Sequence, residues 1–135
     1  MRDIHTSSEE ETVEAGRGLA AELRVGDVVL IDGPLGAGKT AFVRGLAEGL
    51  RADPGEVSSP TFTILQQYRS TPMLYHADLY RLTPAEAADL GLEETGLDGV
   101  LAVEWPDRWD GWPESAIQIA IEDLGGQDRQ IRIRR

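Results

Sequence analysis

Residues 33–40 are the stretch of the sequence whose residue types and spacing most directly indicate chemistry. They read Gly33-Pro-Leu-Gly-Ala-Gly-Lys-Thr40 and fit the phosphate-binding pattern G-x-x-x-x-G-K-[ST] at every defined position. Glycines let successive backbone N–H groups turn inward and form a nest for phosphate oxygens. Lys39, the only lysine among 13 basic residues, would reach the β- and γ-phosphates of a nucleotide. The Thr40 hydroxyl would bind Mg²⁺.

The segments on either side of this loop support a phosphate site. Residues 27–32 contain four consecutive apolar residues, which predict a strand buried on both faces. A helical pattern follows at once, carried by Phe42, Val43, Leu46 and Leu50. The helix N-terminus would add unpaired N–H groups and the positive end of its dipole. The alternative is a glycine-rich turn without a ligand, and the strand–loop–helix order favours the phosphate site.

Two carboxylates come at the ends of later predicted strands. Residues 73–78 predict a strand ending in Asp78, where a carboxylate could bind Mg²⁺ through water or orient an attacking water. Residues 100–103 are apolar and lead into Glu104, the general form of a Walker B site, although the usual residue there is aspartate. The alternative for Glu104 is a solvated strand-end charge, but a phosphate-binding loop makes a metal-side role the stronger hypothesis. His76 shares a strand face with Asp78, and we expect a structural role for it.

Two further groups of residues have both a functional and a structural interpretation. The hydroxyls around Thr61 could sense a γ-phosphate or Mg²⁺, or could satisfy a turn, and spacing alone favours the turn. Trp105, Trp109 and Trp112 could form a partner-docking patch or could cover the sheet edge, and the sequence favours neither.

The hydrophobic pattern of the whole chain predicts an α/β fold. We expect a P-loop NTPase-like mixed sheet with flanking helices and an antiparallel C-terminal hairpin over residues 116–134. Residues 63–68 predict a further strand. Capping signals predict helices over about 8–24 and about 83–91. Residues 92–99 are acidic and are predicted to be irregular.

Length and composition restrict the class of protein. The 135 residues suffice for one P-loop domain with a central sheet and its covering helices. No signal-peptide pattern and no apolar run of about 18 residues is present. The chain has no cysteine, which fits a cytoplasmic protein. A formal charge of −11 argues against direct binding of DNA or RNA.

Four motifs in the right order closely resemble the bacterial ATPase family of tRNA threonylcarbamoyladenosine biosynthesis. They are the loop at 33–40, Ser-Ser-Pro-Thr-Phe at 58–62, His-Ala-Asp-Leu-Tyr-Arg at 76–81 and Glu104-Trp105. The resemblance covers nearly the whole chain. One departure is Pro34, where the family usually has an aspartate whose side chain is not needed for phosphate contact.

The resemblance assigns roles to individual residues. Residues 33–40 would bind the phosphates of ATP or ADP, through Gly33, Leu35, Gly36, Ala37, Gly38, Lys39 and Thr40. Thr40 and Glu104 would hold Mg²⁺, and Asp78 would be needed for hydrolysis together with Lys39 and Glu104. Thr61 would belong to a switch-like loop, and Trp105 would lie beside the nucleotide. Thr12 would approach the base or ribose.

The resemblance also implies a function and partners. The chain would be a weak ATPase required for the threonylcarbamoyladenosine modification (t6A37) of tRNA. It would act in a complex with the threonylcarbamoyl-transferring subunit and that subunit's inactive paralogue, which would supply most of the contact with tRNA. Three alternatives are a small-molecule kinase, a GTPase switch and a non-catalytic nucleotide-gated scaffold. The GTPase alternative fails because a guanine-reading Asn-Lys-x-Asp motif requires a lysine other than Lys39.

Overall fold

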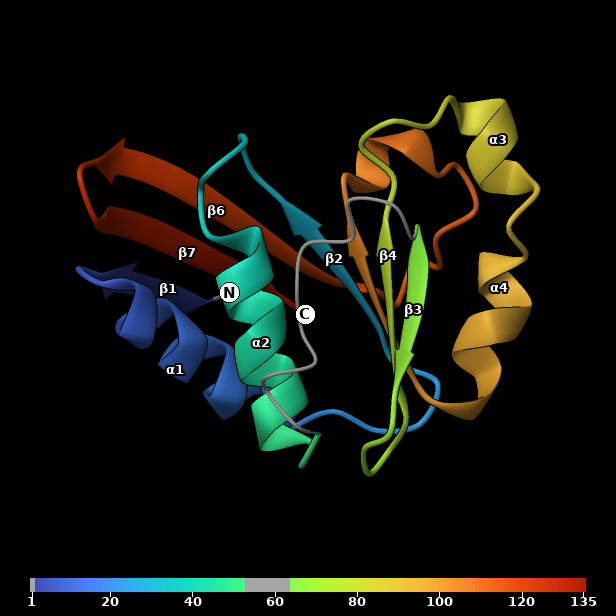
Figure 1. The fold of residues 1–135 in the computed structure, drawn as a ribbon, viewed down its shortest axis with the longest axis horizontal. Coiled ribbons are helices and arrows are strands. Elements are labelled where there is room, and N and C mark those ends of the chain that lie inside the picture. The colour runs from blue at the N-terminus through green and yellow to red at the C-terminus, as the bar shows by residue number, and fades with distance from the viewer. Residues whose placement is uncertain (1, 53–63) are drawn as a thin grey trace.

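The computed structural model describes residues 2–52 and 64–135. Its strands form one mixed sheet in the order β1-β7-β6-β2-β5-β4-β3 (Figure 1). The strands are β1 (Arg2–Thr6), β2 (Val28–Asp32), β3 (Leu65–Tyr68), β4 (Leu74–Asp78), β5 (Val100–Glu104), β6 (Ile117–Gly125) and β7 (Asp128–Arg134). The α-helices are α1 (Glu9–Ala20), α2 (Lys39–Gly49), α3 (Pro84–Ala88) and α4 (Leu92–Thr95).

The centre of the sheet is parallel and its edges are antiparallel. β2 pairs in parallel with both β5 and β6, and β4 pairs in parallel with β5. β7 and β1 extend one side in antiparallel order, and β3 closes the other side as an antiparallel partner of β4. The predicted mixed sheet and C-terminal hairpin are confirmed, with the hairpin's first strand joined to the parallel core.

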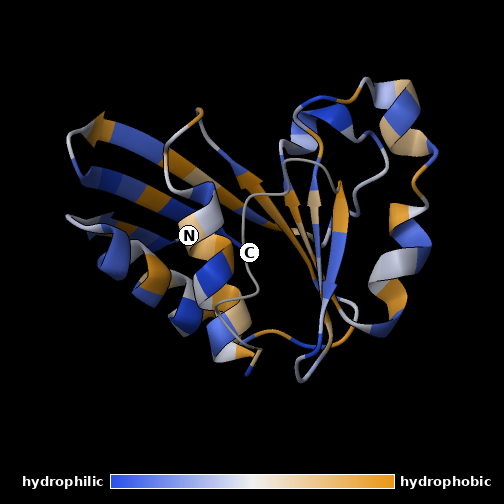
Figure 2. Cartoon of the chain, viewed as in Figure 1, coloured by the Kyte–Doolittle hydropathy of each residue, from blue (hydrophilic) through white to orange (hydrophobic). Residues whose placement is uncertain are grey.

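Side chains alternate along the central strand β2 and fill two hydrophobic cores. Val29 and Ile31 pack into the core that includes residues of α1 and α2. Val28 and Leu30 pack into the core on the opposite face, with Ala87 of α3 and Leu92 of α4. Figure 2 shows the hydrophobic residues concentrated along these central strands. The prediction of a strand buried on both faces is correct, and it explains the uninterrupted apolar run.

Side-chain caps mark the beginnings of α1 and α3. Ser8 caps α1, with its hydroxyl oxygen accepting a hydrogen bond from the Glu11 N–H at 3.1 Å. Thr83 and Glu86 form a complete capping box at the start of α3. The prediction that the first helix reaches about residue 24 is wrong, because α1 ends at Ala20 and turns follow.

Residues 92–99 differ from the irregular segment that the sequence predicted. They form the one-turn helix α4 and a 3₁₀ turn over Gly96–Asp98. Leu92, the first residue of α4, is fully buried in the core beneath α3 and α4. A four-residue helix is too short to show helical periodicity, so no pattern in residues 92–95 indicated it.

The three tryptophans differ in their surroundings. Trp109 is buried in the core and its indole N–H donates to the Glu93 carboxylate at 3.2 Å. Trp112 is 38% exposed, and Trp105 lies at the cavity described below. Because Trp109 is buried, the three rings do not form one exposed docking patch, and the choice between docking and edge cover for Trp105 and Trp112 stays a prediction. Among the helices of the described ranges, none has the length and apolar character that crossing a membrane requires.

Candidate functional site

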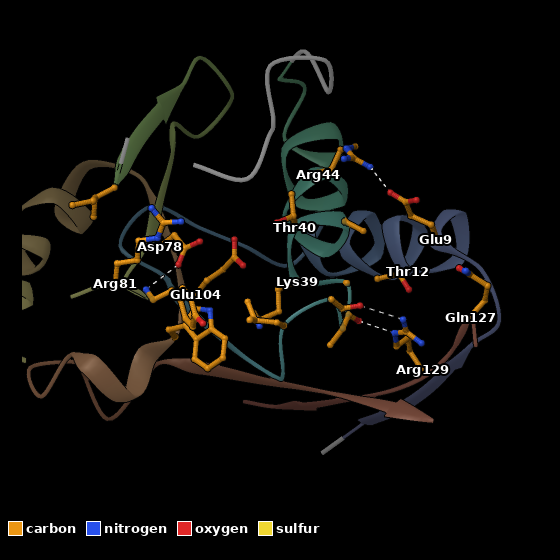
Figure 3. A pocket seen from close by; sticks show the side chains of 18 of the residues that line it. Glu9, Thr12, Lys39, Thr40, Arg44, Asp78, Arg81, Glu104, Gln127 and Arg129 are labelled. Carbon is orange, nitrogen blue, oxygen red and sulfur yellow. Dashed lines mark hydrogen bonds and ion pairs between the residues drawn. The ribbon is translucent and has the colours of Figure 1, made fainter. Parts of the chain in front are cut away.

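A cavity of about 930 Å³ lies at the carboxyl ends of β2, β4 and β5 (Figure 3). Its lining brings together nearly all the residues that the sequence predicted for a nucleotide site. These are Thr12, Leu35, Gly36, Ala37, Gly38, Lys39, Thr40, Asp78, Glu104 and Trp105. Gly33 lies at the base of the loop and does not line the cavity. Thr61 lies outside the described residues, so its predicted role remains a prediction.

The glycine loop turns directly into the N-terminus of α2 at the cavity. Gly38 is the N-cap of α2 and has a φ of 102°, a left-handed conformation that side chains disfavour. A Cβ atom at Gly38 would lie 3.5 Å from the methyl carbon of Thr12 on α1. The Thr12 hydroxyl is in turn hydrogen-bonded to the Thr6 hydroxyl at 3.0 Å. The loop, α1 and β1 therefore meet at one wall of the cavity.

The ammonium of Lys39 is held close to its own loop. Its Nζ donates to the carbonyl oxygens of Gly33 and Pro34, the latter at 2.9 Å. The Trp105 ring lies beside it, with Nζ 4.2 Å from the ring centroid. Burial lowers the pKa of Lys39, and the carboxylates of Glu104, Asp78 and Asp32 oppose that shift. A phosphate would offer this cation a charged acceptor in place of two neutral carbonyls.

Asp78 and Glu104 lie side by side at the ends of two neighbouring strands. They are paired in the parallel register of β4 and β5, so both carboxylates reach the same edge of the sheet. The Asp78 carboxylate accepts a hydrogen bond from the Tyr80 N–H at 3.0 Å. Burial raises the pKa of Asp78 despite that hydrogen bond, and the Glu104 carboxylate raises it further. Asp78 therefore takes up a proton more readily than an exposed aspartate.

Glu104 is 3% exposed and its Oε2 lies 2.6 Å from Nε2 of the fully buried His76. This contact between β4 and β5 was not predicted from the sequence, which indicated only that His76 shares a face with Asp78. The two residues are 28 positions apart in the chain, so no local spacing could reveal the pair. The structure places His76 against the candidate Walker B carboxylate.

Trp105 follows β5 in an uncommon backbone conformation. Its φ of 60° and ψ of 55° lie in the left-handed region, which bulky residues rarely adopt. The conformation sets the ring beside Lys39 and against the Tyr80 ring, with ring centroids 4.9 Å apart. Backbone strain of this kind concentrates at functional sites.

The sequence of nearly the whole chain is similar to that of known proteins. Residues 6–131 match the family model described as threonylcarbamoyl adenosine biosynthesis protein TsaE. The chain belongs to the TsaE family. Two TsaE relatives bear the name tRNA threonylcarbamoyladenosine biosynthesis protein TsaE. The one from Treponema pallidum is 39% identical, over 98% of this chain and 99% of its own. The one from Bacillus subtilis is 42% identical, over 93% of this chain and 80% of its own.

The crystal structure of Bacillus subtilis YdiB shows the same fold as this TsaE-family chain. The two superpose with a TM-score of 0.77 at 35% identity, over 98% of this chain and 83% of YdiB. The fold class predicted from the sequence is therefore confirmed, and so is the family resemblance. Membership of the TsaE family and a P-loop-like fold both point to nucleotide binding.

Three arginines line the cavity of this TsaE-family chain, Arg44, Arg81 and Arg129, and none was assigned to nucleotide binding from the sequence. Arg129 of β7 donates to the carbonyl oxygens of Gly36 and Ala37 in the glycine loop (Figure 3). Arg44 of α2 pairs with Glu9 of α1 at 2.9 Å on the cavity wall. Arg129 contacts the loop across 92 residues of sequence, so no motif could have found it.

The residues that line the cavity have the donor chemistry that Mg²⁺ prefers. Thr40 offers a hydroxyl oxygen, and Glu104 and Asp78 offer carboxylates. No group of three or more acidic or histidine side chains among residues 2–52 and 64–135 is arranged to hold a metal by itself. Mg²⁺ typically takes one or two protein carboxylates together with substrate phosphates and water. The donor set therefore fits a metal that binds together with a nucleotide.

Proposed function

We propose that this chain is a Mg²⁺-dependent ATPase that serves the t6A37 modification of tRNA, with all 135 residues forming one P-loop domain. One observation carries the proposal: the Lys39 ammonium, the Thr40 hydroxyl and the carboxylates of Asp78 and Glu104 line the same cavity at the N-terminus of α2. Membership of the TsaE family supports the pathway. We expect the protein to work in the cytoplasm, where tRNA is modified.

Each of these cavity residues would have a separate role in ATP hydrolysis. The glycine loop and the α2 N-terminus would bind the phosphates through backbone N–H groups, and Lys39 would neutralise the β- and γ-oxygens. Mg²⁺, held by Thr40 and Glu104, would offset charge on the phosphate oxygens. Asp78 would orient the attacking water and accept its proton as the new oxygen–phosphorus bond forms and the β–γ bridge breaks. Its raised pKa suits this transfer.

The chain would hydrolyse ATP slowly by itself and would couple turnover to partner proteins. We expect a complex with the threonylcarbamoyl-transferring subunit and that subunit's inactive paralogue, which would supply most of the tRNA contact. The chain's charge of −11 is consistent with that division. Arg44 and Arg81 both line the cavity and could stabilise the transferred phosphoryl group, as could an arginine from a partner.

The experiment is an ATP and GTP hydrolysis assay with Mg²⁺, run on the chain alone and after addition of the two partners. We expect ATP-selective release of inorganic phosphate that rises with the partners and is lost in Glu104→Gln and Thr40→Val. Transfer of phosphate to an acceptor other than water would support a small-molecule kinase instead. Tight ATP binding without turnover under every condition would support a nucleotide-gated scaffold.

A further inference from the structure

We propose that His76 is a positioning residue that holds the Glu104 carboxylate in the orientation required for Mg²⁺ binding. This inference rests on the proposed function, in which Glu104 binds the metal. His76 does not line the cavity, so it would act only through Glu104.

The geometry of the pair leaves little freedom to either side chain. His76 lies on β4 opposite Ala102 of β5, and Glu104 lies two residues further along β5. His76 is 0% exposed and Glu104 is 3% exposed, so both side chains are buried. The 2.6 Å separation of Nε2 and Oε2 is that of a strong, charge-assisted hydrogen bond.

The chemistry of the pair fixes the direction of the hydrogen bond. An ionised carboxylate only accepts hydrogen bonds, so Nε2 of His76 carries the proton and donates it. The other ring nitrogen, Nδ1, is buried and has no hydrogen-bond partner among the described residues. Among the described residues, the ring therefore makes one polar contact, to Glu104, and the unpaired Nδ1 is an exception to the rule that buried polar atoms are hydrogen-bonded.

The hydrogen bond distinguishes the two oxygens of Glu104. Oε2 accepts from His76, and in the described part of the chain no hydrogen bond reaches Oε1. Because Glu104 lines the cavity, Oε1 is the oxygen left for a ligand. Groups that hydrogen-bond a metal-binding side chain fix its orientation, and their loss typically lowers metal affinity by about 10- to 100-fold.

The test compares nucleotide affinity with Mg²⁺ and with EDTA, measured by calorimetry with ADP as the probe. We define the Mg²⁺ ratio as the dissociation constant of ADP in EDTA divided by that in Mg²⁺, so a larger ratio means a larger contribution of the metal to binding. Thermal unfolding in EDTA reports the stability of each variant. We expect His76→Leu to lower this ratio by about 10- to 100-fold while the affinity in EDTA stays near that of the parent chain. A purely structural role would change stability, or both affinities together, and would leave the ratio unchanged.

Two variants of similar polarity keep the test decisive if His76→Leu does not fold. A glutamine places its amide nitrogen near the position of Nε2, whereas an asparagine reaches only as far as Nδ1. We expect His76→Gln to retain most of the Mg²⁺ ratio and His76→Asn to lose it. Equal ratios in these two variants would overturn the inference.

Glu104→Gln separates failure of this inference from failure of the proposed function. If Glu104→Gln lowers the Mg²⁺ ratio and His76→Leu, tested in the Glu104→Gln background, lowers it no further, then the two residues act through one path. If Glu104→Gln lowers the ratio but His76→Leu and His76→Asn alone do not, the positioning role is wrong and the metal site stands. If Glu104→Gln leaves the ratio unchanged, the proposed metal site itself is wrong.

Discussion

The guanidinium of Arg129 hydrogen-bonds the carbonyl oxygen of Ala37 at 3.0 Å and that of Gly36 at 3.2 Å. Arg129 itself is held by the Asp123 carboxylate and by the carbonyl oxygens of Gly126 and Asp128 in the β6–β7 hairpin. The hairpin thus braces the glycine loop from outside the parallel core. Fixing the two carbonyls outward favours the inward direction of the neighbouring N–H groups, which phosphate binding requires.

Arg129→Met should therefore weaken nucleotide binding. Hydrogen bonds to charged groups contribute about 1.5–3 kcal/mol each, so loss of the brace should lower ADP affinity by about 10-fold or more in calorimetry. Arg134→Met is the matched control, because Arg134 is an exposed residue of the same strand. Equal affinities in the two variants would show that the loop keeps its shape without the hairpin.

Lys39→Ala should remove most of the affinity for phosphates and little of the affinity for the nucleoside. The loss of a charge-assisted contact should weaken ATP and ADP binding by about 10- to 100-fold. Adenosine is the matched control ligand, since it lacks the phosphates that Lys39 would contact. A parallel loss of adenosine affinity would indicate that the substitution disturbs the cavity as a whole.

Trp105 should report nucleotide binding by its fluorescence. The Lys39 ammonium lies 4.2 Å from the ring centroid, and a phosphate that draws this charge away would change the emission of the indole. We expect a change on addition of ADP that persists in Trp112→Phe and disappears in Trp105→Phe. A signal that survives Trp105→Phe would have to come from Trp109 or Trp112, and would contradict the contact with Lys39 as its source.

Gly45→Ala should destabilise the protein because α1 and α2 are in close contact at this point. A Cβ atom there would lie 2.0 Å from the carbonyl oxygen of Val13, so the helices would have to separate. We expect the free energy of unfolding in urea to fall by about 1–3 kcal/mol. Gly18→Ala is the matched control, since nothing lies within 4 Å of its added Cβ on α1. That substitution should raise stability by about 0.5–1 kcal/mol.

Asp78→Asn should stabilise the protein at neutral pH while abolishing hydrolysis. Because burial raises the pKa of Asp78, the folded state keeps this proton to higher pH than the unfolded chain. The free energy of unfolding therefore falls as pH rises from the ordinary aspartate pKa of about 3.9 through the raised value. An asparagine at this position does not ionise, so it removes this pH-dependent loss of stability. Its side-chain oxygen can still accept a hydrogen bond from the Tyr80 N–H.

Urea unfolding at several pH values tests this prediction. The stability difference between Asp78→Asn and the parent chain should be largest at pH 7 and should vanish below the ordinary aspartate pKa. Asp110→Asn, at an exposed turn, is the control. A difference that does not change with pH would mean that the substitution acts through packing and not through protonation.

Sequence patterns were sufficient where a structural feature depends on neighbouring residues. The glycine loop, its buried strand and its helix are consecutive in the chain, so spacing and periodicity predicted all three. The same holds for Asp78 and Glu104, because each comes at the end of a predicted strand and parallel strands bring their carboxyl ends to one edge of the sheet. The C-terminal hairpin was predictable because its isoleucines alternate with polar or small residues.

Contacts between distant segments could not be predicted in this way. The hydrogen bond between His76 and Glu104 depends on β4 and β5 being neighbours in the sheet. No local sequence pattern predicts the order of the strands. Arg129 is the second residue of β7, next to the hairpin turn, and no local pattern indicates its contact with the glycine loop. The short helix α4 was not predicted for a different reason: one turn of helix contains too few buried residues to show a helical period.

The antiparallel pairing of β1 with β7 has a practical consequence for attaching labels or carrier proteins. Thr6 pairs with Arg129 at the cavity end of these strands, and Arg2 pairs with Ile133 at the other. Four residues of strand, about 13 Å at ~3.3 Å per residue, therefore separate both described ends of the chain from the level of the cavity. The two marked ends lie close together (Figure 1), so a fluorophore, a surface tether or a fused domain attached at either end would leave from the end of these strands that is away from the cavity. Both attachments should leave ADP binding unchanged.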